Sequence, residues 1–316
     1  MSNQSFGGKW TEQKLLALEK YLRAYLQIFT KNSKAKMFTR HYVDAFAGSG
    51  WRSISKESTN VTQLSFPILE DIDEIKKYAE GSVRRVLSLD DALDFHRYWF
   101  VEKDNQHAES LRKMIATDFP DKNERCQIEK CDANQFIPKW INNLQWNDRA
   151  VVFLDPYGMD VKWTTIEIIA KSKKVDLWML FPTSAVIRLM PKKYPPKEEW
   201  EHRLTEFFGD DSWKDEFYQE SIQPDIFGET GTERTVTDES VANYLLRRLE
   251  NIFAGVIDQP LVLKNSRNST LFMLVFAAGN PNGAELAKRI ANNIVETTSN
   301  DPRFYRGLPK PVTLGG

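Results

Sequence analysis

The run Asp44-Ala45-Phe46-Ala47-Gly48-Ser49-Gly50 places a carboxylate and closely spaced glycines directly after an apolar segment. In a doubly wound α/β sheet the first strand ends in a tight turn, where glycines let the backbone approach a bound molecule more closely than a Cβ would allow. A carboxylate in that turn suits a hydroxyl or cationic group, whereas it would repel a phosphate. The run therefore predicts a cofactor loop for a ligand that has no phosphate.

S-adenosylmethionine (SAM) is such a ligand, since it carries a sulfonium, an ammonium, a ribose diol and an adenine. The loop resembles the first motif of class I SAM-dependent methyltransferases, particularly those that act on exocyclic amines of nucleobases. This resemblance implies cofactor contacts at Asp44, Phe46, Ala47, Gly48 and Gly50. Taken alone, the loop is equally compatible with a turn that binds nothing.

A second candidate for chemistry is Asp155-Pro156-Tyr157-Gly158, which follows the apolar residues 150 to 154. It resembles the Asp-Pro-Phe-Gly motif, with Tyr for Phe, and in part the Asp-Pro-Pro-Tyr motif, of methyltransferases that act on adenine N6, cytosine N4 or guanine N2. An exocyclic amine is a poor nucleophile because its lone pair is delocalised into the ring. A carboxylate and a backbone carbonyl that accept its two N–H bonds would orient that lone pair toward the methyl group.

These roles can be assigned residue by residue. Asp155 accepts from the amine and lies beside the cofactor, Pro156 shapes the loop by fixing φ, and Tyr157 offers a face on which a base can stack. The alternative is a plain turn after a strand, with proline at its second and glycine at its fourth position.

Further acidic residues end two more predicted strands. Glu102 follows residues 98 to 101, where an acidic side chain can hydrogen-bond a ribose diol, and Asp132 follows residues 126 to 131. For any one of them, an N-cap of the next helix is the alternative. Their common order favours a SAM site, with the following cofactor contacts besides the loop: Glu102, Lys103, Asp132, Ala133 and Asp155.

The hydrophobic periodicity predicts the elements that position these residues. Helices are expected at residues 11–31, 82–95, 105–119, 198–208 and 238–253, strands at 42–46, 98–102, 126–131, 150–154 and 175–181, and a closing hairpin from 261–263 and 270–278. This order predicts a Rossmann-like α/β fold of the class I methyltransferase type, with a mostly parallel seven-stranded sheet, a C-terminal antiparallel hairpin and an N-terminal helix. We expect an N-terminal helical extension at 1–37, the methyltransferase-like domain at 38–290 with insertions at about 51–80 and 186–235, and a tail at 291–316.

The composition of the 316 residues narrows the functional class. A net charge of −1 gives no overall field that would attract a polyanion, so a nucleic acid would need a local basic patch, for which residues 188 to 197 are a candidate.

The two cysteines, Cys126 and Cys131, and the four histidines show no metal-ligand spacing, so no metal is expected. The longest apolar run, residues 271 to 278, is too short to span a membrane, and the polar start lacks signal-peptide character, which predicts a cytoplasmic protein.

Several motifs together resemble the three-Cys-motif partner (TcmP) family. They are Lys14-Leu15-Leu16, residues 19 to 22, 42 to 50, 100 to 104 and 153 to 158. The resemblance implies a methyltransferase-like bacterial protein that has a radical-SAM-like, three-Cys-motif protein as its partner. It supports SAM binding at Asp44, Gly48, Gly50 and Glu102 and supplies no substrate.

The sequence thus predicts a SAM-dependent methyltransferase that modifies an exocyclic amine of a nucleobase in RNA or DNA. The alternative is a subunit that keeps the methyltransferase fold and serves the three-Cys-motif partner without catalysis of its own. A methyltransferase for small molecules or proteins is a third reading, because the chain has no overall basic charge.

Overall fold

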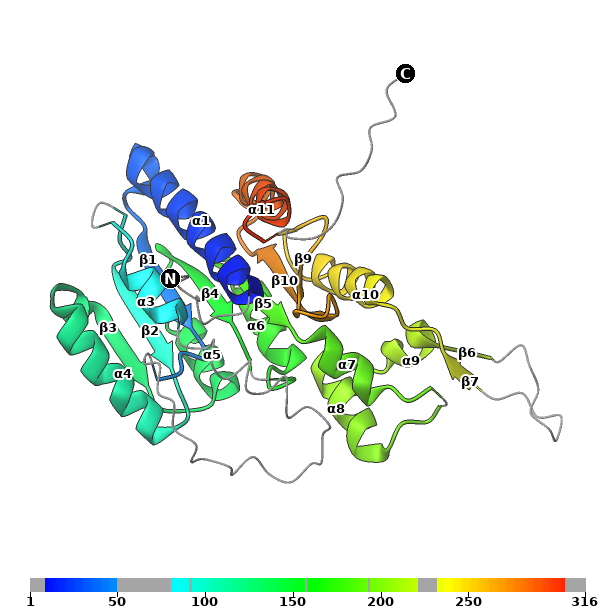
Figure 1. Ribbon diagram of the computed structural model, residues 1–316. Helices are drawn as coiled ribbons and strands as arrows, with labels where there is room; N and C mark the ends of the chain where they lie inside the picture. The colour runs from blue at the N-terminus through cyan, green and yellow to red at the C-terminus, as the bar shows by residue number, and fades with distance from the viewer. Residues whose placement is uncertain are drawn as a thin grey trace, which may run out of the picture.

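The computed structural model describes residues 9–49, 81–90, 93–156, 158–192, 194–220 and 232–304. Within these residues the main sheet has eight strands in the order β3-β2-β1-β4-β5-β10-β8, with β9 paired to β10 (Figure 1). β1 to β5 are parallel to their neighbours, whereas β10 is antiparallel to β5, β8 and β9. The strands are β1 (Thr39–Asp44), β2 (Arg97–Val101), β3 (Cys126–Glu129), β4 (Asp148–Leu154), β5 (Val175–Phe181), β8 (Gly255–Val256), β9 (Leu261–Lys264) and β10 (Thr270–Ala278).

This topology confirms the predicted Rossmann-like α/β fold with its antiparallel closing hairpin. The sheet has eight strands where seven were expected, because the two-residue β8 is too short to leave a sequence pattern. β1 ends at Asp44, two residues earlier than predicted, so its carboxylate stands at the strand end itself. β4, β5 and β10 form the buried centre of the sheet, as their long apolar runs indicated.

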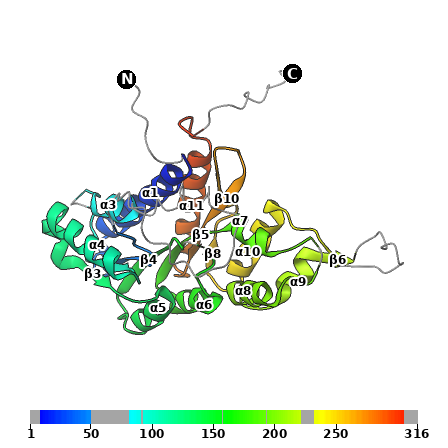
Figure 2. The same cartoon turned by 60° about the horizontal axis from the view of Figure 1, so that its bottom comes forward.

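Helices cover both faces of the sheet. Figure 2 shows α1, α3 and α11 on one face and α5 and α6 on the other. The helices of these two layers are α1 (Lys9–Lys31), α3 (Ser82–Leu87), α4 (Asn105–Asp118), α5 (Ala133–Asn142), α6 (Trp163–Ser172) and α11 (Ala284–Ser299), with 3-10 turns at Ser33–Ala35 and Pro120–Arg125. α3 is shorter than the predicted helix at 82–95, and the boundary expected at residue 290 falls within α11.

A helical unit is inserted between β5 and β8 and extends to one side of the sheet (Figure 1). It contains α7 (Thr183–Leu189), α8 (Glu198–Phe208), α9 (Ser212–Phe217), α10 (Asp238–Glu250) and the antiparallel pair β6 (Tyr218–Glu220) and β7 (Thr232–Arg234). α8 has the predicted bounds, and α10 ends three residues earlier than predicted. The long connection expected at residues 51–80 lies outside the described residues.

Buried polar contacts as well as apolar packing fix α1 on the sheet. Tyr21 donates its hydroxyl to Asp176 Oδ2 in β5 at 2.8 Å, and the amide of Gly279 donates to Asp176 Oδ1 at 3.2 Å. Burial raises the pKa of Asp176 to about 6, and the Tyr21 hydrogen bond opposes that rise. At the surface, Arg85 of α3 contacts Glu12 and Glu19 of α1 at 2.8 and 3.1 Å. The position of α1 is therefore set along its length.

Replacement of Tyr21 by Phe should destabilise the fold more at pH 8 than at pH 5. Asp176 has a folded pKa above its unfolded value, so it is neutral at pH 5 and charged at pH 8, where it needs the lost donor. We expect a loss of about 1–3 kcal/mol in unfolding free energy at pH 8, measured by urea denaturation at both pH values.

Tyr25→Phe is the matched control. The Tyr25 hydroxyl on the same helix is buried and has no hydrogen-bond partner, so its removal should leave stability equal or slightly higher. Equal losses in both variants would contradict a specific role for the contact between Tyr21 and Asp176.

Candidate functional site

The carboxyl ends of three adjacent parallel strands meet at one edge of the sheet. β1 lies between β2 and β4, so Asp44 at the end of β1 is flanked by Glu102, directly after β2, and Asp155, directly after β4. Ligands of open α/β sheets bind at this edge. The fold thus brings together three of the carboxylates that the sequence singled out.

The loop after β1 is held against both neighbouring strands. Ala45 donates its amide to the carbonyl of Phe153 and Ala47 donates to that of Val101, both at 3.0 Å. Gly48 then adopts a φ of 65°, a left-handed conformation that favours glycine. The predicted cofactor loop is therefore a fixed turn with its backbone close to the strand ends.

Glu102 ties this loop to the next helix. Its Oε2 accepts the amide of Gly48 at 2.9 Å and its Oε1 accepts the amide of Asp104 at 2.8 Å. The side chain is buried, so the two backbone donors stabilise its charge. Glu102 shapes the glycine loop directly, a role that the sequence did not reveal.

Asp44 is fully buried and has an incomplete set of hydrogen bonds. Oδ1 accepts the amide of Phe46 at 3.3 Å, whereas no donor in the described part of the chain makes a hydrogen bond to Oδ2. Burial raises the pKa of Asp44 to about 7; the neighbouring Ser82 hydroxyl opposes the rise, and the charge of Asp155 adds to it. A buried oxygen without a donor is unfavourable in the empty protein, and a ligand that donates there would relieve it.

Asp155 forms a buried ion pair that sequence reasoning missed. Lys14 of α1, with 2% of its side chain exposed, places Nζ at 2.5 Å from Asp155 Oδ2. The ammonium also lies 5.4 Å from the ring centroid of Trp10 and 6.0 Å from that of Phe153. Lys14 falls in the apolar stripe of α1 between Trp10 and Leu18, and a charge in such a stripe is the signal that could have revealed it.

The remaining predicted residues are placed as follows. Asp132 caps α5 by accepting the amide of Asn134 at 2.8 Å, so the N-cap alternative describes its side chain. Phe46 is half-buried, Ala47, Gly48, Ala133 and Pro156 are buried, and Lys103 is exposed between β2 and α4. Gly50 and Tyr157 lie outside the described residues.

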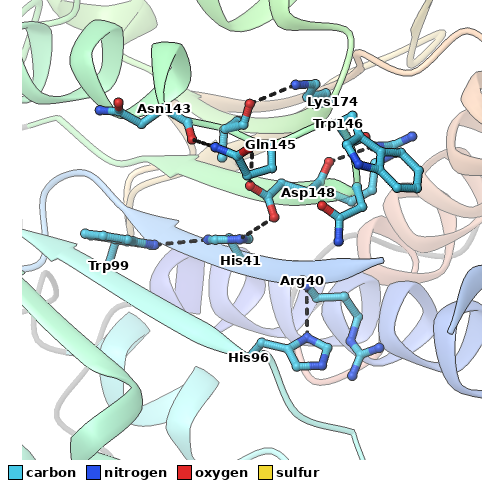
Figure 3. Close-up of polar contacts among 12 residues, drawn as sticks. Arg40, His41, His96, Trp99, Asn143, Gln145, Trp146, Asp148 and Lys174 are labelled. Atoms are coloured by element: carbon cyan, nitrogen blue, oxygen red, sulfur yellow. Dashed lines mark hydrogen bonds and ion pairs between the residues drawn. The ribbon is translucent and has the colours of Figure 1, made fainter. Parts of the chain in front are cut away.

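A cavity of about 770 Å3 lies apart from this edge, between α5 and the sheet near the starts of β1, β2 and β4. At its floor Trp99 donates Nε1 to His41 Nδ1 at 3.2 Å, and His41 Nε2 lies 3.2 Å from Asp148 Oδ1 (Figure 3). The amide of Gln145 donates to Asp148 Oδ2 at 2.7 Å. Burial lowers the pKa of His41, against the attraction of Asp148. Most of these polar groups contact one another, although His41 Nε2 makes no hydrogen bond of good geometry within the described residues, and such an arrangement is typical of a structural network.

The segment considered for nucleic-acid binding forms helix and loop, and two of its four basic side chains make local contacts. Arg188 donates to the Ser184 hydroxyl at 3.1 Å, and the ammonium of Lys197 lies 5.1 Å from the Trp200 ring centroid. In the same inserted unit, Arg247 pairs with Glu216 at 2.7 Å. Lys193 lies outside the described residues.

Two further searches covered the described parts of the chain. They contain no group of three or more His, Cys, Asp or Glu side chains arranged to hold a metal ion. Every helix in them is too short or too polar to cross a membrane.

The sequence matches no known family model, and a comparison with curated proteins finds no match. Among solved structures, the chain is similar to a protein of Legionella pneumophila str. Philadelphia 1 described by the family model DUF519, with 13% identity, 93% of this chain and 94% of that chain covered, and a TM-score of 0.45. It is also similar to the glycopeptide N-methyltransferase MtfA complexed with sinefungin, with 12% identity and a TM-score of 0.33; 88% of this chain and 89% of that chain are covered. Trm1 from Pyrococcus horikoshii with S-adenosyl-L-methionine has 10% identity, 87% of this chain and 58% of that chain covered, and a TM-score of 0.35. At these values the neighbours carry no argument about the site, which rests on its own geometry.

Replacement of Asp44 by Asn should stabilise the empty protein relative to wild type as pH rises. The folded pKa of Asp44, about 7, lies above its unfolded value, so its favourable contribution is complete at low pH and is lost as pH rises through 7. The Asn side chain does not titrate. The difference in unfolding free energy between the variant and wild type should therefore grow by up to about 4 kcal/mol between pH 4 and pH 8. Urea denaturation at a series of pH values measures it, and a variant that loses stability equally at all pH values would contradict the assignment.

Proposed function

We propose that this protein is a SAM-dependent methyltransferase that transfers a methyl group to an exocyclic amine of a nucleobase in RNA or DNA. The observation that carries the proposal is the position of Asp155. Its carboxylate, 9% exposed, stands at the end of β4 beside the glycine loop and the unpartnered oxygen of Asp44. A carboxylate there can hold an amine next to a bound cofactor.

The residues at the edge of the sheet fit SAM. Asp44 Oδ2 can accept from an ammonium or hydroxyl group, and the absence of a phosphate suits the acidic character of the edge. The turn at Gly48 leaves room for close approach of the cofactor to the backbone. The proposed cofactor contacts are Asp44, Phe46, Ala47, Gly48, Gly50, Glu102, Lys103, Asp132, Ala133 and Asp155.

When bound, SAM supplies an electrophilic methyl group on a sulfonium. Asp155 accepts one N–H of the amine and so turns the nitrogen lone pair toward that methyl group. A carboxylate in this place would also stabilise positive charge on an amine nitrogen that accepts a methyl group. Asp155 would then be a candidate acceptor for the proton that this nitrogen releases. Pro156 holds the loop, and Tyr157 is proposed to stack on the base.

A second candidate function is a subunit that serves a radical-SAM-like three-Cys-motif protein without catalysis of its own, as the resemblance to the TcmP family implies. The ion pair between Lys14 and Asp155 favours it, because it gives Asp155 a structural partner in the same chain. Measurement of methyl transfer distinguishes the two functions.

Replacement of Asp155 by Ala should remove most methyl transfer, whereas the SAM affinity should fall much less, because the other proposed cofactor contacts remain. The test is calorimetry with SAM, followed by incubation with labelled SAM and total RNA or DNA and analysis of the nucleosides. Loss of the carboxylate is expected to lower the rate at least about a hundredfold. SAM binding without any labelled nucleoside would favour the non-catalytic subunit, and absence of SAM binding would contradict both cofactor and reaction.

Gly158→Ala is predicted to fold normally and to change only substrate use. A Cβ at Gly158 meets no described atom within 4 Å, so the melting temperature should be unchanged. If the base packs over this turn, KM for the nucleic acid should rise about tenfold with a similar SAM affinity. Gly209→Ala is the contrasting control, because its Cβ would lie 2.2 Å from Trp163 Cδ1 at a φ of 92°, and it should lower the melting temperature.

A further inference from the structure

Lys14 is a buried cation at the proposed reaction centre. Its side chain is 2% exposed, and its ammonium lies at 2.5 Å from Asp155 Oδ2. A lysine is seldom buried to this extent unless a partner compensates its charge. The ion pair joins residues that are 141 positions apart in the chain, so it exists only in the folded protein.

The helix that carries Lys14 is fixed to the rest of the fold. On the buried side Tyr21 donates to Asp176, and the Trp10 ring lies 5.1 Å from that of Phe272. On the exposed side Arg85 holds Glu12 and Glu19. The contacts of its helix therefore hold Lys14 in the site.

The ion pair uses one of the two carboxylate oxygens of Asp155. Among the described residues no group donates a hydrogen bond to Oδ1, and 9% of the side chain is accessible. Because the ammonium of Lys14 holds Oδ2, the carboxylate of Asp155 keeps one orientation. Oδ1 is then available for an incoming N–H donor.

Asp155 also has a like charge nearby. Asp44 is close enough for the two carboxylates to repel each other, and Lys14 opposes the resulting rise in the pKa of Asp44. Among the described residues, the phenol of Tyr42 also faces Asp155, and burial keeps this phenol neutral by raising its pKa. Lys14 contacts Asp155 directly, whereas it acts on Asp44 through the attraction of charges alone.

We propose that Lys14 is a positioning residue, which holds Asp155 in its charged form and in the orientation that accepts the substrate amine through Oδ1. The proposal rests on the proposed function and assigns a direct part in the site to helix α1. The proposal predicts that the ammonium of Lys14 acts on Asp155, and that SAM still binds when this ammonium is removed.

The first test compares Lys14→Met and Lys14→Arg with wild type in methyl transfer and SAM affinity across pH. In Lys14→Met the rate at pH 7 should fall about a hundredfold and the acidic limb of the pH–rate profile should move up by about one to two units. The SAM affinity should stay within about threefold, and Lys14→Arg should recover a large part of the rate because it restores the charge. Lys20→Met is the matched control and should behave as wild type, because Lys20 lies on the same helix and its ammonium contacts the Thr298 hydroxyl at 3.4 Å, away from Asp155.

The second test needs no turnover. Carbon-13 NMR of labelled aspartate carboxyls, with Asp155→Asn to assign the signal, follows protonation of Asp155 directly. Its midpoint should rise by at least about one unit in Lys14→Met. Lys14→Met should also lower the melting temperature, and Lys14→Met with Asp155→Asn should recover part of it, because no unpaired charge is then buried.

The outcomes separate this proposal from the proposed function. An unchanged Asp155 midpoint in Lys14→Met overturns the role of Lys14 even if the wild type transfers methyl groups. If the main effect of Lys14→Met is a loss of SAM affinity, the positioning role is also overturned, because Lys14 would then act in cofactor binding. Absence of methyl transfer by the wild type contradicts the proposed function, and the NMR titration still decides the effect of Lys14 on Asp155.

Discussion

The docking of α1 on the sheet is the constraint on which the site depends. Two polar side chains of its buried face, Lys14 and Tyr21, each meet a carboxylate that the sheet provides, Asp155 after β4 and Asp176 in β5. Apolar packing opposes a shift of this helix through the cavities and overlaps that a shift would create. A shift here would also leave an ammonium and two carboxylates buried without partners, which is unfavourable. The polar pairs therefore select one register of α1 and fix it above the strand ends.

The three acidic residues at that edge are stabilised in three different ways. Glu102 accepts two backbone amides, Asp155 has an ammonium, and Asp44 keeps one oxygen without any donor. Both oxygens of Glu102 have donors among the described residues, whereas Asp155 has a partner for Oδ2 alone. The third is a local conflict between burial and hydrogen bonding, and such conflicts are typical of functional sites. A ligand with a donor or a positive charge would resolve it, which is why Asp44 is proposed as a cofactor contact.

Much of this edge could be predicted from the sequence because it depends on local patterns. Apolar runs that end in Asp44, Glu102 and Asp155 indicated buried parallel strands, and the order of parallel strands brings their ends together. The partners of these residues were less predictable. The contact between Lys14 and Asp155 joins distant parts of the chain, and the amides that Glu102 accepts depend on the turn at Gly48. The short elements α7, α9, β6 and β7 were missed because three to seven residues leave no clear periodicity. The sequence analysis also predicted no helix at α5, α6 and α11, although these have 10, 10 and 16 residues.

Asp132 shows why a carboxylate at a strand end is weak as a sign of function by itself. It follows β3, whereas Asp44 is the last residue of β1, and its side chain accepts a backbone amide of α5 and so caps that helix. The two differ in the hydrogen bonding that remains open: a cap is satisfied by its own helix, whereas Asp44 Oδ2 is buried without a donor among the described residues. Position along the sequence cannot distinguish them, because both lie at the end of a predicted strand. The distinction lies in the fold, which brings β1 between β2 and β4 and so surrounds Asp44 with two more acidic residues, whereas β3 lies at the edge of the sheet.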